Sequence, residues 1–147
     1  MKLAVAFLLG MVAMVAIQGK TSDWATATVR SHHMERGKGY EEQNMGLGIE
    51  HSLFGNTRLA LGFYRNSERR DSVYAAGVYC PVSVRWGNWR VCGLAGGVSG
   101  YSDDVAPLAG LVMAYESKEW GLNLILFPNG KGDFSNGLVA AQIKRRF

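Results

Sequence analysis

The feature that most constrains the fold is a series of eight segments, each about ten residues long, in which apolar and polar side chains alternate. Residues with turn chemistry separate these segments, and the chain after residue 19 shows no convincing helical period. The segments predict β-strands over residues 24–34, 44–53, 57–66, 72–81, 89–100, 105–116, 120–127 and 137–147.

The connections between these segments alternate in length. The short ones cover residues 54–56, 85–88 and 117–119, and the more polar, mostly longer ones cover 35–40, 67–71, 101–104 and 128–136. An even number of antiparallel strands, with short turns at one end and longer loops at the other, is typical of outer-membrane barrels. The sequence therefore predicts an all-β fold, an eight-stranded antiparallel up-and-down transmembrane β-barrel.

The two faces of the predicted strands differ in polarity. Along the third segment, Leu59, Leu61 and Phe63 fall on one side, and the residues between them fall on the other. A secreted soluble barrel of the lipocalin type would turn its apolar face inward. Charged side chains are costly on a lipid-facing surface, so a polar lumen favours the membrane barrel. The polar residues that we expect inside are Arg30, Glu50, Arg58, Arg90, Asn123, Gln142 and Lys144.

The first 19 residues have the pattern of a secretory signal. Lys2 precedes an unbroken apolar run over residues 3–17, which is too short to cross a bilayer as a mature helix but suits the core of a signal peptide. A buried N-terminal helix or a retained anchor is the alternative. We assign residues 1–19 to a signal peptide, with the cleavage position left open, and residues 20–147 to the barrel. We expect the mature protein in the outer membrane.

Charge and cysteine content narrow the possible partners. The formal net charge is +4, and basic runs such as Arg69-Arg70 are too short for a nucleic-acid-binding surface. The chain has no CxxC motif and no His/Cys/Asp cluster at metal-ligand spacing, so we expect no metal and no cofactor. For a transmembrane barrel, the expected partners are outer-membrane lipids and the barrel assembly machinery. We expect a monomer.

Cys80 and Cys92 lie on the fourth and fifth predicted strands, at equal distances in sequence from Trp86. An antiparallel register centred on Trp86 would place the two cysteines opposite each other, at a separation that permits a disulfide. A register shifted by one residue would turn them to opposite faces. A disulfide and a pair of buried thiols therefore both remain possible at this stage.

Several positions predicted to face the lumen are small, namely Gly46, Gly48, Ala60 and Gly62. An eight-stranded barrel has a bore that is either filled by side chains or holds one small ligand. The small residues would leave a slot for one acyl chain, or they would make room for large neighbours such as Tyr64. The sequence does not decide between the two.

From Tyr40 to the C-terminus the chain resembles the PagP family of outer-membrane lipid A palmitoyltransferases. The resemblance lies in "GLGIEHSLFGNTRLALGFYRNS" (46–67), "APLAG" (106–110) and "LFPNGKGDFSNG" (126–137), which match segments of that family in order. The resemblance implies an eight-stranded barrel that moves a palmitoyl chain from a phospholipid to a hydroxyl of lipid A without a metal or nucleotide.

The resemblance also implies three site residues. The family histidine at the outer end of the first strand falls on His33, with the neighbouring His32 as the alternative, and the serine after the third strand falls on Ser67. The family aspartate falls on Asn66, which can orient an imidazole but cannot stabilise its positive charge. His33 would act as the base and Ser67 would hold the developing oxyanion or position the substrate. From the residues alone, Asn66-Ser67 is equally typical of a turn.

Two functions follow from these observations. The first is a PagP-like acyltransferase or lipid-binding barrel that acts on acyl chains of lipid A or phospholipid. The second is a non-enzymatic small barrel of the OmpX or OmpA type with a structural or surface-interaction role. The histidine and serine positions favour the first, whereas Asn66 and the short segment before the first strand favour the second, so the sequence leaves enzymatic activity open.

The C-terminal residue provides a test of the membrane-barrel prediction. Phe147 ends a strand with apolar residues at alternate positions, a pattern that resembles the outer-membrane assembly signal. We expect deletion of Phe147 to lower the yield of the folded form, measured by heat-modifiable mobility on a denaturing gel, without altering the barrel that does assemble. Normal assembly without Phe147 would count against the membrane barrel.

Overall fold

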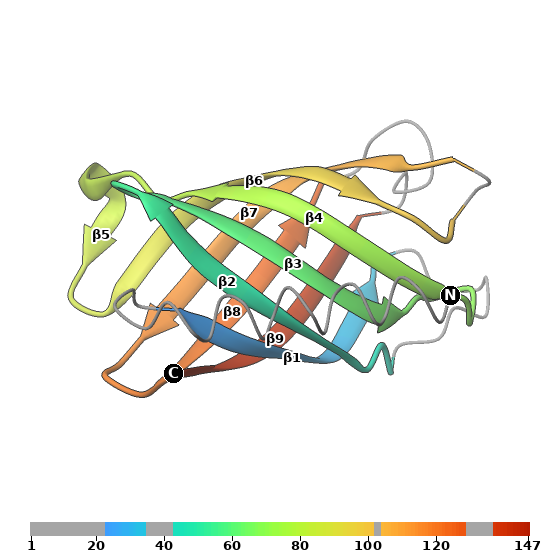
Figure 1. Ribbon diagram of the computed structural model, residues 1–147, viewed down its shortest axis with the longest axis horizontal. Helices are drawn as coiled ribbons and strands as arrows, with labels where there is room; N and C mark the ends of the chain where they lie inside the picture. Colours follow the sequence, from blue (N-terminus) through green and yellow to red (C-terminus); the bar gives the residue numbers. More distant parts are fainter. Residues whose placement is uncertain (1–22, 35–42, 102–103, 129–136) are drawn as a thin grey trace.

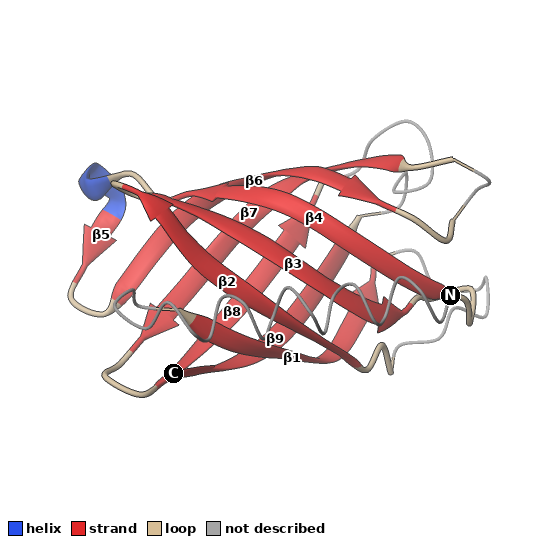
Figure 2. Ribbon diagram, viewed as in Figure 1, coloured by secondary structure: helices blue, strands red, loops and turns tan. Residues whose placement is uncertain are grey.

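The computed structural model describes residues 23–34, 43–101, 104–128 and 137–147, and most of them lie in β-strands (Figures 1 and 2). Eight long strands form one closed antiparallel barrel, so the predicted fold class is confirmed. Among the described residues no helix is long and apolar enough to cross a membrane. The long strands are β1 (Trp24–His33), β2 (Gly46–Phe54), β3 (Thr57–Arg65), β4 (Asp71–Tyr79), β6 (Trp89–Val98), β7 (Ala106–Glu116), β8 (Trp120–Phe127) and β9 (Leu138–Arg146).

Each long strand pairs with the long strands before and after it in sequence, and the pairing of β1 with β9 closes the circle. The first strand pairs with the last over nine rungs, from Trp24↔Arg146 to His33↔Leu138. Strands β4 and β6 pair from Tyr74↔Val98 to Tyr79↔Gly93. Closure satisfies the backbone groups that an open sheet would leave unpaired at its edges. The result is an up-and-down barrel whose tilted strands are visible in Figure 1.

The connection between β4 and β6 differs from the prediction. A short turn at residues 85–88 was expected, but the chain forms a 3₁₀ turn, η1 (Val82–Val84), and a two-residue strand, β5 (Arg85–Trp86). Strand β5 folds back on the start of β6, with Trp86 opposite Trp89. Gly87 adopts a φ of 58°, which a tight hairpin between these residues requires. The expected connection was therefore too short, because Pro81 ends β4 before the hairpin begins.

The two ends of the barrel are different. One end, hereafter the termini end, is named for the start of β1 and the end of the chain after β9, where the backbone nitrogen of Phe147 donates to the carbonyl of Asp23 at 3.2 Å. The turns after β2 and β7 and the β5 hairpin also lie at this end (Figure 1). At the opposite end, hereafter the loop end, β1, β3, β6 and β8 end.

Side-chain facing follows the predicted alternation in most strands. In β8, Gly121, Asn123 and Ile125 are buried in the lumen, while Trp120 and Leu124 are exposed on the outer surface. Apolar side chains pair across neighbouring strands on the outside, as in Leu111↔Leu126 and Met113↔Leu124. The barrel therefore carries apolar side chains on its outer surface and encloses a smaller set of charged ones, among them Glu50, Glu116 and Lys144.

Arg30 is the exception to the predicted lumen set. A bulge between Thr28 and Arg30 shifts the pairing of β1 with β9, so Arg30 lies opposite Ala141 and is exposed. One extra residue in a strand reverses the facing of every residue beyond it. The prediction that Arg30 faces the lumen was wrong for this reason. The buried members of the predicted set are Glu50, Arg58, Asn123, Gln142 and Lys144, and Arg90 is partly buried.

The small residues on the inner face make room for two tyrosines. A Cβ atom added to Gly48 would lie 2.6 Å from the hydroxyl of Tyr74, and one added to Gly62 would lie 2.6 Å from the ring of the same tyrosine. A Cβ on Gly46 would overlap Tyr64. The structure therefore favours the second of the two explanations for these small residues, because large neighbours already occupy the space beside them.

Cys80 and Cys92 form a disulfide, which decides the question that the sequence left open. The β4–β6 register continues from Tyr79↔Gly93 to the two cysteines, whose Cα atoms are 4.1 Å apart. Both residues are buried. The bond ties β4 to β6 at the termini end, next to the longest connection at that end.

Chemical labelling tests this bond. We expect the unfolded, unreduced protein to take up no alkyl group and the reduced protein to take up two, measured by intact mass. The double variant Cys80→Ser/Cys92→Ser should lose about 2–4 kcal/mol of unfolding free energy, because the bond restricts the unfolded chain. Uptake of two alkyl groups before reduction would contradict the structure.

Candidate functional site

The lumen near the termini end is filled by a cluster of buried charges. Glu50 accepts hydrogen bonds from Arg58 and Lys144, each at 3.1 Å. Glu116 accepts hydrogen bonds from the two terminal nitrogens of the Arg58 guanidinium and from the Lys144 ammonium at 2.7 Å. It also forms an ion pair with the Arg90 guanidinium at 3.1 Å. These five residues, hereafter the charge cluster, come from β2, β3, β6, β7 and β9, so they connect strands on different sides of the barrel.

Amide side chains extend the cluster toward the middle of the lumen. The Asn123 amide donates to Glu50 at 2.5 Å and to Gln142 at 3.3 Å. Gln142 in turn donates to the Thr28 hydroxyl at 3.1 Å. On the other side, the Lys144 ammonium lies 4.9 Å from the centre of the fully buried Trp24 ring. These contacts surround the buried charges with polar and aromatic partners, as buried ions require.

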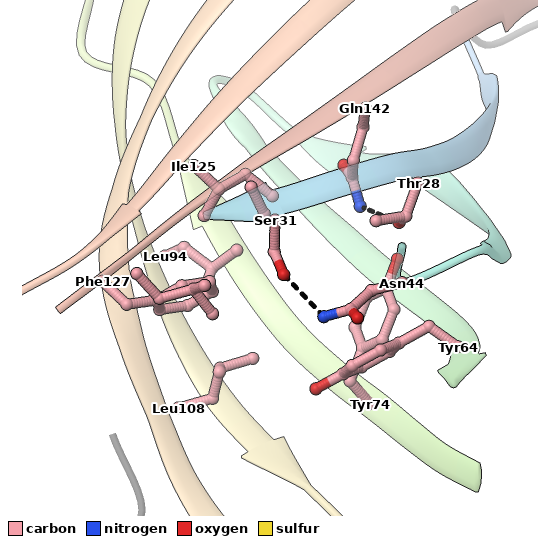
Figure 3. Close-up of a pocket in the computed structure, with 12 residues that line it drawn as sticks. Thr28, Ser31, Asn44, Tyr64, Tyr74, Leu94, Leu108, Ile125, Phe127 and Gln142 are labelled. Carbon is pink, nitrogen blue, oxygen red and sulfur yellow. Dashed lines mark hydrogen bonds between the residues drawn. The ribbon is translucent and has the colours of Figure 1, made fainter. Parts of the chain in front are cut away.

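Above the charge cluster, toward the loop end, the lumen contains a cavity of about 60 Å³ (Figure 3). Its walls are apolar on one side and polar on the other. The apolar lining residues are Leu94, Leu108, Ile125, Phe127, Leu138 and Ala140, and the polar ones are Thr28, Ser31, Asn44, Tyr64, Tyr74 and Gln142. Dry apolar cavities of roughly 150 Å³ accept a benzene-sized molecule, so this space suits only a few carbon atoms unless a lining side chain moves.

The polar groups around this cavity are held by specific bonds. The hydroxyl groups of Tyr64 and Tyr101 are 3.0 Å apart, which links β3 to the connection after β6. The Asn44 amide donates to the Ser31 hydroxyl at 2.6 Å, as the dashed line in Figure 3 shows. Both Ser31 and Asn44 are 2 % exposed.

Asn66, one of the three predicted site residues, anchors the connection between β3 and β4. Its side-chain nitrogen donates to the Ser72 hydroxyl at 3.0 Å and to the Gly100 carbonyl at 2.9 Å. Its side-chain oxygen accepts from the backbone nitrogens of Glu68 and Arg70, each at 2.9 Å. These four bonds use the full hydrogen-bonding capacity of the amide. In this structure Asn66 therefore performs the turn chemistry that its residue type allows.

Ser67 and His33 lie at the same end of the barrel as Asn66. Ser67 follows Asn66 in the β3–β4 connection and is buried. His33 is the last residue of β1 and pairs with Leu138, but its side chain lies outside the described residues. His32, the alternative, is exposed and pairs with Val139. Asn66 and Ser67 thus lie together in the connection after β3. Strand β2 separates β3 from β1, the strand that ends with His33.

The Ser31–Asn44 pair was missed by the sequence analysis. Ser31 lies beyond the β1 bulge, so simple alternation from Trp24 assigns it the wrong face, and Asn44 precedes the start of β2. Only the pattern of β9, where Ala140 lies opposite Ser31, indicates that Ser31 faces inward.

Within the described part of the chain, no group of three or more His, Cys, Asp or Glu side chains is arranged to hold a metal ion. Comparison of the chain with protein-family models and with curated proteins finds no match.

The charge cluster predicts a large stability effect for one carboxylate. Replacing Glu116 with Gln removes a charge that faces three cations and leaves Glu50 to balance them. We expect Glu116→Gln to lower the free energy of unfolding by about 3–5 kcal/mol, measured by denaturant titration of the barrel in detergent micelles.

The matched control is Glu68→Gln, because Glu68 lies 3.9 Å from Arg70 in an exposed ion pair. Its effect should stay within about 1 kcal/mol. Equal effects of the two substitutions would show that the buried charges do not support the barrel.

Proposed function

We propose that this protein is an outer-membrane barrel that holds an acyl chain of a surrounding lipid in its loop-end cavity. Three features support the membrane location: the closed antiparallel barrel, the apolar outer surface of β7 and β8, and the exposed Trp120 at the termini end. Together with the expected signal peptide, they favour an exported monomer that the barrel assembly machinery inserts.

The observation that carries the lipid-binding proposal is that the apolar cavity lies directly above the charge cluster. Leu94, Leu108 and Ile125 offer hydrocarbon contacts toward the loop end, while the charge cluster fills the lumen toward the termini end. An acyl chain gains free energy by leaving water for such a wall but would not displace paired ions. The chain end would enter from the loop end and stop above Gln142. A longer segment requires Phe127 or Leu108 to move, because the cavity measures about 60 Å³.

In an enzyme of the PagP type, a hydroxyl of lipid A would attack the ester carbonyl of a phospholipid. His33 would take the hydroxyl proton as the new carbon–oxygen bond forms, and Ser67 would donate a hydrogen bond to the oxyanion. Collapse of the intermediate would break the original ester bond, and the departing lysophospholipid oxygen would take the proton from His33. Asn66 would hold the loop that carries Ser67, consistent with its bonds to Ser72 and Gly100. The reaction needs no cofactor.

The second candidate is a non-enzymatic barrel of the OmpX or OmpA type. The bonds of Asn66 favour it, because both amide hydrogens are committed to Ser72 and Gly100 and neither is available to orient an imidazole. In this case the loop end would serve contacts at the cell surface, and the cavity would be a packing feature.

Mass spectrometry of lipid A from cells with and without the protein separates the candidates. We expect an added acyl mass with the wild type and none with His33→Ala. Ala140→Phe, which fills the cavity, should also abolish the added mass. The matched control, Ala141→Phe, adds the same group to the outer face and should keep the activity.

Heat-modifiable mobility would verify that each variant folds. Unchanged lipid A in cells that contain folded wild-type barrel would exclude the enzyme and favour the second candidate. Retained activity in folded Ala140→Phe would exclude the cavity as the acyl site.

A further inference from the structure

The Ser31–Asn44 pair leaves hydrogen-bonding groups unused inside an apolar cavity. The Asn44 side-chain oxygen is buried and has no partner within the described structure. Ser31 receives a bond from the Asn44 amide at 2.6 Å, and its own hydroxyl hydrogen remains free to donate. Both residues line the cavity, as Figure 3 shows. Burying an unpaired polar atom costs free energy, so a ligand group that hydrogen-bonds to this atom would be stabilised here.

The other polar side chains of the cavity help to show that this pair is distinctive. Thr28 accepts a hydrogen bond from Gln142, and the Tyr64 hydroxyl pairs with that of Tyr101. Among the lining residues, all of which are described, Asn44 holds the one buried side-chain atom without a partner. The apolar side of the cavity is formed by residues such as Leu94, Leu108 and Phe127, which offer only hydrocarbon.

The chemistry of the pair selects the kind of partner. It presents one acceptor, the Asn44 oxygen, and one donor, the Ser31 hydroxyl. If the amide is turned around, Ser31 donates to Asn44, and the pair then presents a free amide donor and a free hydroxyl lone pair. Either orientation offers a donor and an acceptor side by side. A carboxylate or ester oxygen can only accept, whereas a hydroxyl group can do both.

We propose that Ser31 and Asn44 form a subsite for a hydroxyl group carried on an acyl chain, so that the cavity prefers hydroxylated over unsubstituted chains. This inference rests on the proposed acyl-binding function and adds the substrate class. The pair lies two rungs above Gln142, since Ser31 is opposite Ala140 and Thr28 is opposite Gln142. The hydroxyl would therefore sit on the chain segment inside the cavity, with hydrocarbon on the opposite wall.

Binding of matched fatty acids to the folded barrel in lipid nanodiscs tests the subsite. The probes are dodecanoic acid and its monohydroxy derivatives with the hydroxyl at carbon 3, at carbon 10 or at carbon 12, and the measurement is the dissociation constant by native mass spectrometry. We expect at least one derivative to bind about 3- to 10-fold more tightly than dodecanoic acid, the effect of satisfying the unpaired groups. Asn44→Leu and Ser31→Ala should each bring that ratio to one or below.

Asn56→Leu is the matched control, because Asn56 is exposed in the turn at the termini end, and it should keep the wild-type ratio. Equal affinities for all four acids in the wild type would overturn the subsite while leaving the acyl-binding function intact, and would mean that water fills the position. Binding of none of them would overturn both proposals. The wild-type comparison decides the question even if a variant fails to fold.

Discussion

The closed hydrogen-bond circuit between β1 and β9 is the constraint on which the rest of the structure depends. In the hydrocarbon region of a membrane, an unpaired strand edge would leave backbone groups without partners, at a cost of several kcal/mol each. The nine rungs from Trp24↔Arg146 to His33↔Leu138 remove that edge. They also place the start of β1 and the end of β9 at the same end of the barrel. Once the circle is closed with eight strands, the bore is narrow, and each inward side chain competes for a limited volume.

That volume is divided by polarity along the barrel axis. The charge cluster joins five strands at the termini end, and the carboxylates of Glu50 and Glu116 are shared by cations from β3 and β9. A hydrophobic filling of this half would satisfy packing equally well, so the charges are not required for a stable core as such. The effect of the buried charges here is that they confine the apolar space of the lumen to the loop end. That is the half of the barrel in which the acyl chain is proposed to bind.

At the loop end, some polar side chains use all their hydrogen-bonding groups and others do not. Asn66 ties the β3–β4 connection to Gly100, and the Tyr64–Tyr101 contact ties β3 to the connection after β6. These bonds hold neighbouring loops together above the cavity. Ser31 and Asn44, by contrast, keep bonding capacity to spare although both are buried. The fully bonded groups hold the shape of the loop end, whereas the proposed subsite rests on the unused groups of Ser31 and Asn44.

Local pattern was enough to predict the strands and most of their facing, because the side-chain period of a strand is two. It also indicated a register that places Cys80 opposite Cys92, but it left a disulfide and free thiols both open. The same pattern could not reveal the bulge that turns Arg30 outward, since a bulge is a property of the β1–β9 pairing across more than a hundred residues. Nor could it show that Gly48 and Gly62 make room for Tyr74. Both of these outcomes, and the meeting of Ser31 with Asn44, depend on which side chains closure of the barrel brings together inside a bore of limited width. Local sequence therefore sets which face each residue prefers, and contacts between distant strands decide which residues share the lumen.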